Sequence, residues 1–212
     1  MLEARALSAG YGRARVLYEM SFEAAAGEAV ALLGRNGAGK STTLKAMMGL
    51  VPSWSGEVRF DGLRIDRLAP YEIARLGLGY VPEDRRIFTA LSVAENLEVG
   101  RQPPRPAAPS WSEDRLYALF PALGAMRERR GDRMSGGEQQ MLAIARTLAG
   151  NPKAILLDEP SEGLAPLVVN AVIRAIEELK RAGMTILIAE QSLRFAERVA
   201  DRVYKVEKGR LA

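Results

Sequence analysis

Residues 34 to 41 fit the pattern GxxxxGK[ST] of a phosphate-binding loop. The flanks agree, because residues 28–33 resemble a short buried strand and residues 43–50 the opening of a helix. Glycines let the backbone curl, so that N–H groups and the helix N-terminus face phosphates. Lys40 then reaches the β and γ phosphates of ATP, and the Ser41 hydroxyl coordinates Mg²⁺. The expected nucleotide contacts of this loop are Gly34, Asn36, Gly37, Ala38, Gly39, Lys40, Ser41 and Thr42.

A pair of carboxylates, Asp158 and Glu159, follows the apolar run at residues 154–157. Asp158 can bind Mg²⁺ through water, while Glu159 points elsewhere and can polarise a water for in-line attack on the γ phosphate. The alternative is a pair that only caps a following helix. The phosphate-binding loop in the same chain favours the catalytic interpretation.

Two further side chains are placed to meet the same ligand. Glu83 follows a short apolar run at residues 78–81, and a polar residue at the end of a strand in an α/β sheet often faces a bound ligand. We therefore expect Glu83 in the shell of Mg²⁺ or of a water, the alternative being a solvated loop charge. Tyr11, in the turn at residues 8–12, can stack on adenine or cap the sheet.

A second glycine-rich segment, residues 134–140, leads into an apolar helix. Gly136 and Gly137 at the start of a helix expose N–H donors, and Ser135 adds a hydroxyl, so this is a second anion-binding helix terminus. One chain needs a single phosphate cradle. The second one indicates that it serves the nucleotide of another copy.

Composition narrows the class of protein. The chain has 212 residues, a formal charge of +4, and neither cysteine nor histidine. Its length suits one domain with a real core, and the missing cysteines exclude disulfides and thiolate sites. No apolar stretch is long enough to span a membrane and no leader pattern opens the chain, so we expect it to be soluble and to remain inside the cell. We attribute the mild positive charge to solubility rather than to nucleic acid or membrane binding.

Periodicity predicts alternating strands and helices. We expect strands at residues 2–7, 16–22, 29–33, 57–60, 78–81, 154–158 and 184–189, with a turn at residues 51–56. We expect helices at residues 70–76, 93–97, 111–120, 141–148, 167–182 and 193–200, with an irregular connection at residues 101–109. The arginine-rich run at residues 127–130 is interpreted as a solvated face, the alternative being contact with a partner or a membrane surface.

Taken in order, these motifs resemble the ATP-binding subunit of an ABC transporter over essentially the whole chain. The resemblance makes Tyr11 the aromatic A-loop, residues 34–42 the Walker A motif, residues 134–139 the signature, Asp158 and Glu159 the end of Walker B, and residues 161–166 the D-loop. It implies that Tyr11 and Val16 contact the nucleotide, and that Ser135, Gly136 and Gly137 contact the γ phosphate across a dimer.

Departures from the usual family pattern sharpen the resemblance. Glu83 stands where most members have glutamine in the Q-loop, Gln191 where most have the switch histidine, and Ala165 where most have the D-loop aspartate. This set is similar to the smaller ATPase subunit of branched-chain (hydrophobic) amino acid importers, the LivF type, and the related urea and amide importers share much of it. Gln191 can hydrogen-bond the γ phosphate but cannot carry a proton. Glu83 adds negative charge that is tolerable mainly beside Mg²⁺.

The expected fold is α/β, a P-loop NTPase of the ABC type forming one domain over residues 1–212, with a mostly parallel central sheet, an antiparallel edge region and a helical subdomain at about residues 93–148. The resemblance implies transmembrane permease subunits, a second ATP-binding subunit, favoured as a sister chain, no nucleic acid, and a peripheral position on the cytoplasmic face of the membrane. One rival is an association switch that hydrolyses little ATP. Another is a soluble ABC ATPase of DNA repair or translation, which the missing coiled-coil insertion and single cassette argue against.

Overall fold

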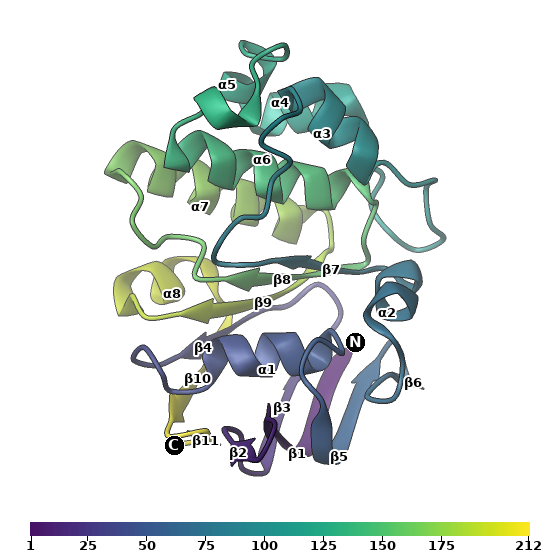
Figure 1. Cartoon of the computed structure of the whole chain (residues 1–212), viewed down its shortest axis with the longest axis vertical. Helices are drawn as coiled ribbons and strands as arrows, with labels where there is room; N and C mark the ends of the chain where they lie inside the picture. Colours follow the sequence, from purple (N-terminus) through teal and green to yellow (C-terminus); the bar gives the residue numbers. More distant parts are fainter.

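The computed structural model describes residues 1–212 and contains two β-sheets with helices packed on them (Figure 1). The strands are β1 (Leu2–Tyr11), β2 (Ala14–Arg15), β3 (Met20–Ala24), β4 (Ala29–Leu33), β5 (Ser53–Phe60), β6 (Leu63–Arg64), β7 (Leu78–Val81), β8 (Ala154–Asp158), β9 (Thr185–Glu190), β10 (Arg202–Glu207) and β11 (Arg210–Leu211). The helices are α1 (Lys40–Met47), α2 (Pro70–Leu76), α3 (Val93–Gly100), α4 (Glu113–Leu119), α5 (Pro121–Gly124), α6 (Gly136–Ala149), α7 (Pro166–Arg181) and α8 (Leu193–Val199), with a 3₁₀ turn at Gly131–Arg133.

The central sheet has the strand order β11-β10-β4-β9-β8-β7 and is parallel except for the edge strand β11. Its inner strands are buried on both faces, which explains their nearly continuous apolar sequence. Along β8 the side chains alternate between two cores. Ile155 and Leu157 belong to the core beneath α6 and α7, whereas Leu156 packs in the core shared with α1 and the second sheet. The sheet is therefore the partition between two hydrophobic layers.

The second sheet is antiparallel, with β1 pairing with β2, β3 and β5. Helix α1 lies between the two sheets, and α6 and α7 cover the opposite face of the central sheet (Figure 1). This arrangement confirms the predicted α/β class with a mostly parallel sheet and an antiparallel edge region.

The segment between β7 and β8 carries helices α3 to α6, stacked beyond the central sheet (Figure 1). Ser92 caps α3, as predicted, through a reciprocal pair of hydrogen bonds with Glu95. Two buried asparagines form hydrogen bonds to the loops that precede α3 and α4. The Asn96 amide bonds to Phe88, Leu91 and Ser92, and Asn151 accepts from Trp111 N–H and donates to Gln102.

Three local predictions were wrong, all of them in the antiparallel sheet. The predicted turn at residues 8–12 is mostly strand, because β1 continues to Tyr11, where it pairs with β2. The predicted strand at residues 16–22 begins only at Met20, because the N–H groups of Val16 and Leu17 both bond to the carbonyl of Ala9 and Glu19 adopts a positive φ of 56°. The predicted turn at residues 51–56 is strand from Ser53 onward, where β5 begins and pairs with β1. The serine and glycine residues of this segment are typical of a turn. The segment forms a strand because it pairs with β1, which is distant in sequence.

Candidate nucleotide site

A cavity of about 340 Å³ opens where β4 and β8 end. It is lined by Val16, Asn36, Gly37, Gly39, Lys40, Ser41, Thr42, Glu83 and Glu159. These residues come from four separate segments of the chain, and the parallel sheet brings them together because the carboxyl ends of its strands meet at one edge. The cavity unites most of the residues that the sequence predicts around a nucleotide.

The loop between β4 and α1 has the curled backbone that phosphate binding requires. Gly37 and Gly39 have φ values of 78° and 110°, a region that favours glycine. Helix α1 begins at Lys40, three residues before the predicted opening at residue 43, because the Thr43 hydroxyl and N–H both close onto the Gly39 carbonyl. Lys40 and Ser41 therefore sit in the first helical turn, where N–H groups point out of the helix end toward the cavity.

Lys40 forms a buried ion pair with Glu159. Its Nζ lies 2.8 Å from Glu159 Oε1, and the two side chains are 3% and 6% exposed. Lys40 Nζ also donates to the Arg35 carbonyl at 3.2 Å. Glu159 has a positive φ of 48°, uncommon for a residue other than glycine. Two residues predicted to act on the γ phosphate are thus in direct contact.

Asp158 is held by two hydroxyl groups. Ser41 Oγ donates to Oδ1 at 2.8 Å and the Tyr80 hydroxyl donates to Oδ2 at 3.0 Å. Burial raises the pKa of the Asp158 carboxyl, and these hydrogen bonds offset part of the rise. Burial and the neighbouring Asp158 also raise the pKa of Tyr80. The structure therefore joins Ser41 and Asp158, both predicted to hold Mg²⁺.

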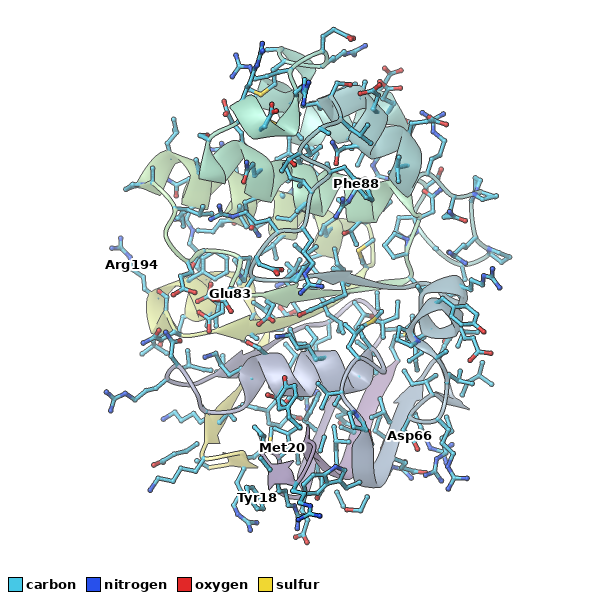
Figure 2. All side chains as sticks on the ribbon, in the orientation of Figure 1. Tyr18, Met20, Asp66, Glu83, Phe88 and Arg194 are labelled. Atoms are coloured by element: carbon cyan, nitrogen blue, oxygen red, sulfur yellow. The ribbon has the colours of Figure 1, made fainter.

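Glu83 lines the same cavity as an exposed side chain just after β7 (Figure 2). Partial burial raises the pKa of its carboxyl, and the charges of Glu162, Asp158 and Glu159 add to the rise. Negative charge thus accumulates on this side of the cavity. No cluster of three or more acidic, histidine or cysteine side chains forms a metal cage by itself. A site with so few protein ligands suits Mg²⁺, which usually keeps several waters and substrate phosphates as its other ligands.

Some predicted site residues lie outside the cavity in the single chain. Tyr11 is half-exposed at the end of β1 and does not line it, although Val16 does. Gln191 lines a separate pocket beside Glu159. Gly34 and Ala38 support the loop from behind, where the N–H of Gly34 bonds to the Glu190 carbonyl.

The glycine-rich segment at the start of α6 also stays away from the cavity. Ser135 accepts a hydrogen bond from the Glu138 N–H, and the Glu138 carboxylate accepts one from the Ser135 N–H. Gly136 abuts Arg85, and Gly137 abuts Val168 in α7. The two helix ends that are predicted to bind phosphate are therefore not assembled into one site within a single chain.

Two residues of the site were not predicted from the sequence. Tyr80 donates to Asp158, and Glu190 is a fully buried carboxylate at the end of β9. Glu190 directly precedes Gln191 at the end of an apolar strand, the same signal that singled out Asp158 and Glu159. The same signal could therefore have identified Glu190 as a candidate site residue. The contact of Tyr80 depends on the register of β7 against β8, where Tyr80 lies opposite Leu156, and a sequence does not give that register.

The arrangement has the parts needed for phosphoryl transfer to water. A lysine and helix N–H groups can neutralise phosphate charge, a hydroxyl and a carboxylate can hold Mg²⁺, and a second carboxylate can orient a water. The site is built for a nucleoside triphosphate.

Comparison with known proteins identifies the family. Residues 17–162 match the family model described as ABC transporter. The chain is 42% identical to the high-affinity branched-chain amino acid transport ATP-binding protein BraG of Pseudomonas aeruginosa, over all of this chain and 91% of that protein. It is 39% identical to the lipopolysaccharide export system ATP-binding protein LptB of Escherichia coli K12, over 99% of this chain and 88% of that protein.

Among solved structures, one titled "Structure of ATP binding subunit of ABC transporter" superimposes with a TM-score of 0.86 at 32% identity, covering all of this chain and 88% of that one. The chain therefore belongs to the ABC transporter family, as an ATP-binding subunit whose enzymatic activity is ATP hydrolysis. None of its helices combines the length and the apolar character that crossing a membrane requires.

Proposed function

We propose that this chain is the ATPase subunit that energises import of branched-chain or other hydrophobic amino acids. The observation that carries the substrate class is the 42% identity to BraG over the whole chain. The departures at Glu83, Ala165 and Gln191, which resemble the LivF type, agree with it. The geometry supports the catalytic part, because Lys40 and Glu159 meet in the cavity beside Asp158.

Mg²⁺ is part of this proposal. Ser41 and Asp158 would hold it, and the joined oxygens of these two residues are the hard ligands that it prefers. Glu83 stands nearby as a third oxygen donor, through water. When bound, Mg²⁺ supplies charge neutralisation at the phosphates. Lys40 would bind the β and γ phosphates, Glu159 would orient the attacking water, and Gln191 would donate a hydrogen bond to the γ phosphate.

The proposed working unit contains two ATP-binding subunits. Ser135, Gly136 and Gly137 do not line the cavity of their own chain, so their helix end is available for the nucleotide of a partner, as expected for a composite site. The LivF resemblance favours a sister chain as that partner. Glu159→Gln should trap a dimer closed on ATP, seen as a doubled mass in light scattering with MgATP. A variant that stays monomeric with MgATP and either partner would contradict the composite site.

The proposed docking surface for a permease is a groove of about 640 Å³ between α2, β7 and the ends of α3 and α6. Phe88 and Val99 are about half-exposed there, and Phe88 lies at the level of the helices above the sheet (Figure 2). Arg75, Arg105 and Arg146 also line the groove, and Arg146 Nη1 is buried without a hydrogen-bond partner. The groove therefore suits a cytoplasmic helix of a membrane subunit with apolar side chains and a carboxylate.

In this proposal residues 1–212 form one ATP-binding domain, and the helical subdomain at about residues 93–148 faces the permease. The domain would sit peripherally on the cytoplasmic face of the membrane. The alternatives are a related urea or amide importer, and an association switch with little hydrolysis. Similarity to LptB adds lipopolysaccharide export as a competing substrate class.

Proteoliposomes test the substrate class. The chain, its sister ATPase, its permease subunits and its binding protein are reconstituted with ATP inside, and uptake of labelled leucine, isoleucine and valine is compared with uptake of urea. We expect uptake of the three amino acids, at least tenfold above the matched Lys40→Ala assembly. Uptake of urea alone, or ATP-driven lipopolysaccharide release, would replace the proposed substrate.

A further inference from the structure

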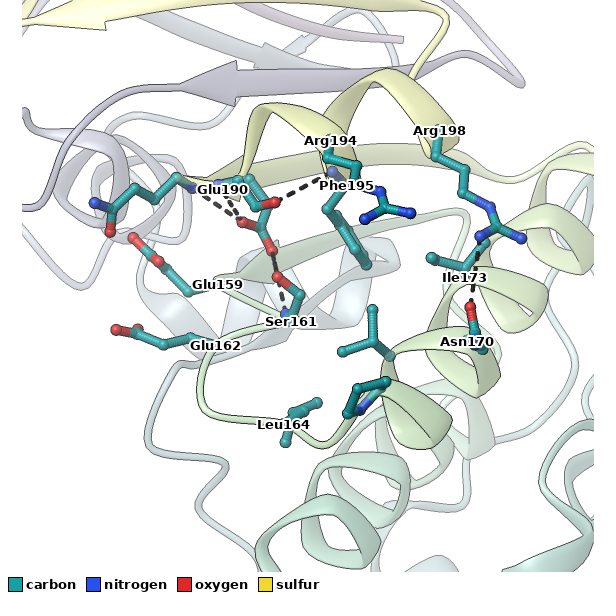
Figure 3. A pocket seen from close by; sticks show the side chains of 14 residues that line it. Glu159, Ser161, Glu162, Leu164, Asn170, Ile173, Glu190, Arg194, Phe195 and Arg198 are labelled. Atoms are coloured by element: carbon teal, nitrogen blue, oxygen red, sulfur yellow. Dashed lines mark hydrogen bonds between the residues drawn. The ribbon is translucent and has the colours of Figure 1, made fainter.

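The carboxylate of Glu190 bridges two loops that carry predicted catalytic groups. Oε1 accepts hydrogen bonds from the N–H of Ser161 at 3.1 Å and from its hydroxyl at 2.5 Å. Oε2 accepts from the N–H groups of Gln191 at 2.9 Å and Ser192 at 3.0 Å. Figure 3 shows this carboxylate between Ser161 and the start of α8, with the Glu159 side chain beside it.

The surroundings of this carboxylate are unusual. Glu190 is 1% exposed and takes part in no ion pair of the structure. A buried carboxylate without a cation is costly unless hydrogen bonds replace the lost hydration, and four donors do so here. A neutral polar residue would fill the same space at lower cost. A carboxylate therefore fits this position, because its two oxygens can accept hydrogen bonds from all four donors at once.

The two loops held by Glu190 begin at the predicted catalytic residues, Glu159 after β8 and Gln191 after β9. Ser161 follows Glu159 by two positions, and the Glu159 N–H bonds to the Ala189 carbonyl at 2.9 Å. Glu159 keeps a positive φ of 48°, a conformation that persists only where neighbouring contacts fix it. The hydrogen bonds at Ala189 and Ser161 fix it from both sides. The bond to the Gln191 N–H fixes the other predicted catalytic residue.

We propose that Glu190 is a positioning residue for ATP hydrolysis, locking the D-loop at Ser161 to the switch residue Gln191. It does not line the nucleotide cavity, so it acts through Glu159 and Gln191 and touches no reacting atom. The proposal deepens the ATPase function and rests on it. It predicts that weakening the link lowers the rate of hydrolysis and leaves ATP binding nearly unchanged.

Glu190→Gln tests the link with little change in shape. A glutamine has one acceptor oxygen and one NH₂, and three of the four partners are backbone donors, so either the Ser161 side or the Gln191 side must lose its acceptor. We expect kcat to fall by about 10- to 100-fold with KM and the Kd for ATP within about twofold. Glu197→Gln, the same change at an exposed position of α8 without an ion pair, is the matched control and should behave like the wild type.

A second variant distinguishes loss of this link from misfolding of the Glu190→Gln protein. Ser161→Ala removes only the hydroxyl donor and should lower kcat by about three- to tenfold. Because both changes act on one link, the loss in the double variant should be smaller than the product of the single losses. Wild-type hydrolysis by Glu190→Gln, multiplicative losses, or an ATP Kd that weakens as much as kcat falls would overturn the proposal.

Hydrogen exchange separates this proposal from the ATPase function itself. In the protein without nucleotide, the amides of Ser161, Gln191 and Ser192 should exchange at least tenfold faster in Glu190→Gln than in the wild type, while the amides of β8 remain protected. Unchanged exchange would overturn the link. Faster exchange together with an inactive wild type would instead count against the proposed catalytic function.

Discussion

Glu159→Gln is expected to destabilise the protein without nucleotide and to tighten its binding of ATP. Both effects come from the ion pair between Lys40 and Glu159, whose charged atoms are 2.8 Å apart and almost fully buried. Lys40 must leave Glu159 to reach phosphates. The ion pair therefore stabilises the free protein and competes with ATP for the same ammonium group.

The structure sets the size of these effects. Removing one partner of a buried ion pair costs roughly 3–5 kcal/mol of unfolding free energy. Glutamine keeps an oxygen that can accept from Lys40, and the Arg35 carbonyl remains a partner at 3.2 Å, so we expect about 2 kcal/mol. For a chain of this length that lowers the Tm by about 4–8 °C. In the variant, ATP binding no longer has to break the ion pair to release Lys40. Removing this cost of about 2 kcal/mol lowers the Kd for ATP by about 30-fold.

Thermal unfolding without nucleotide and titration with a fluorescent ATP analogue, at concentrations that keep the chain monomeric, measure the two quantities. Glu197→Gln again provides the control, because it removes an exposed charge that is in no ion pair. A Glu159→Gln variant whose Tm and Kd both equal those of the wild type would refute this account of the ion pair.

Three further substitutions test the burial of Asp158, the hydrogen bonds of Asn96 and the close packing of Gly137. Burial raises the pKa of Asp158, so its ionised carboxylate lowers the free energy of unfolding at any pH where the carboxyl is ionised in both the folded and the unfolded state. Asp158→Asn should therefore raise the Tm at pH 8. The gain should shrink as the pH falls toward about 4, the pKa of an unfolded aspartate. Equal gains at both pH values would contradict this. Asn96→Ala removes four hydrogen bonds that fix residues 88–92, and denaturant titration should show a loss of about 2–4 kcal/mol. Gly137→Ala places a methyl carbon 2.7 Å from Val168 Cγ2 and should cost about 1–3 kcal/mol, a loss that Val168→Ala in the same chain should partly reverse.

Much of the fold could be predicted because local sequence and tertiary environment agree along the central sheet. The strand at Leu78–Val81 and the helix at Pro70–Leu76 have the predicted bounds. Their boundaries are set by proline, glycine and a sharp change in apolar content, all of which are local features. The opening of β5 at Ser53 failed for the opposite reason, because its pairing with Ala9 depends on a strand more than forty residues earlier.

The site divides in the same way. The phosphate-binding loop is a contiguous motif, so its residues and their cavity could be inferred together. Contacts between segments could not be. The pairing of Lys40 with Glu159 joins two motifs through the order of strands β4, β9 and β8. Glu190 carried a strand-end signal, but only the approach of Ser161 gives its carboxylate four donors.

The most direct test of the central claim is phosphate release from MgATP at rising protein concentration, with the wild type beside Glu159→Gln. A composite site with Glu159 as the residue that orients the water predicts release per chain that climbs with concentration in the wild type, measured alone and mixed with its sister ATPase, and that falls sharply in the variant. Release that is independent of concentration and survives in Glu159→Gln would contradict both the composite site and the role of that carboxylate.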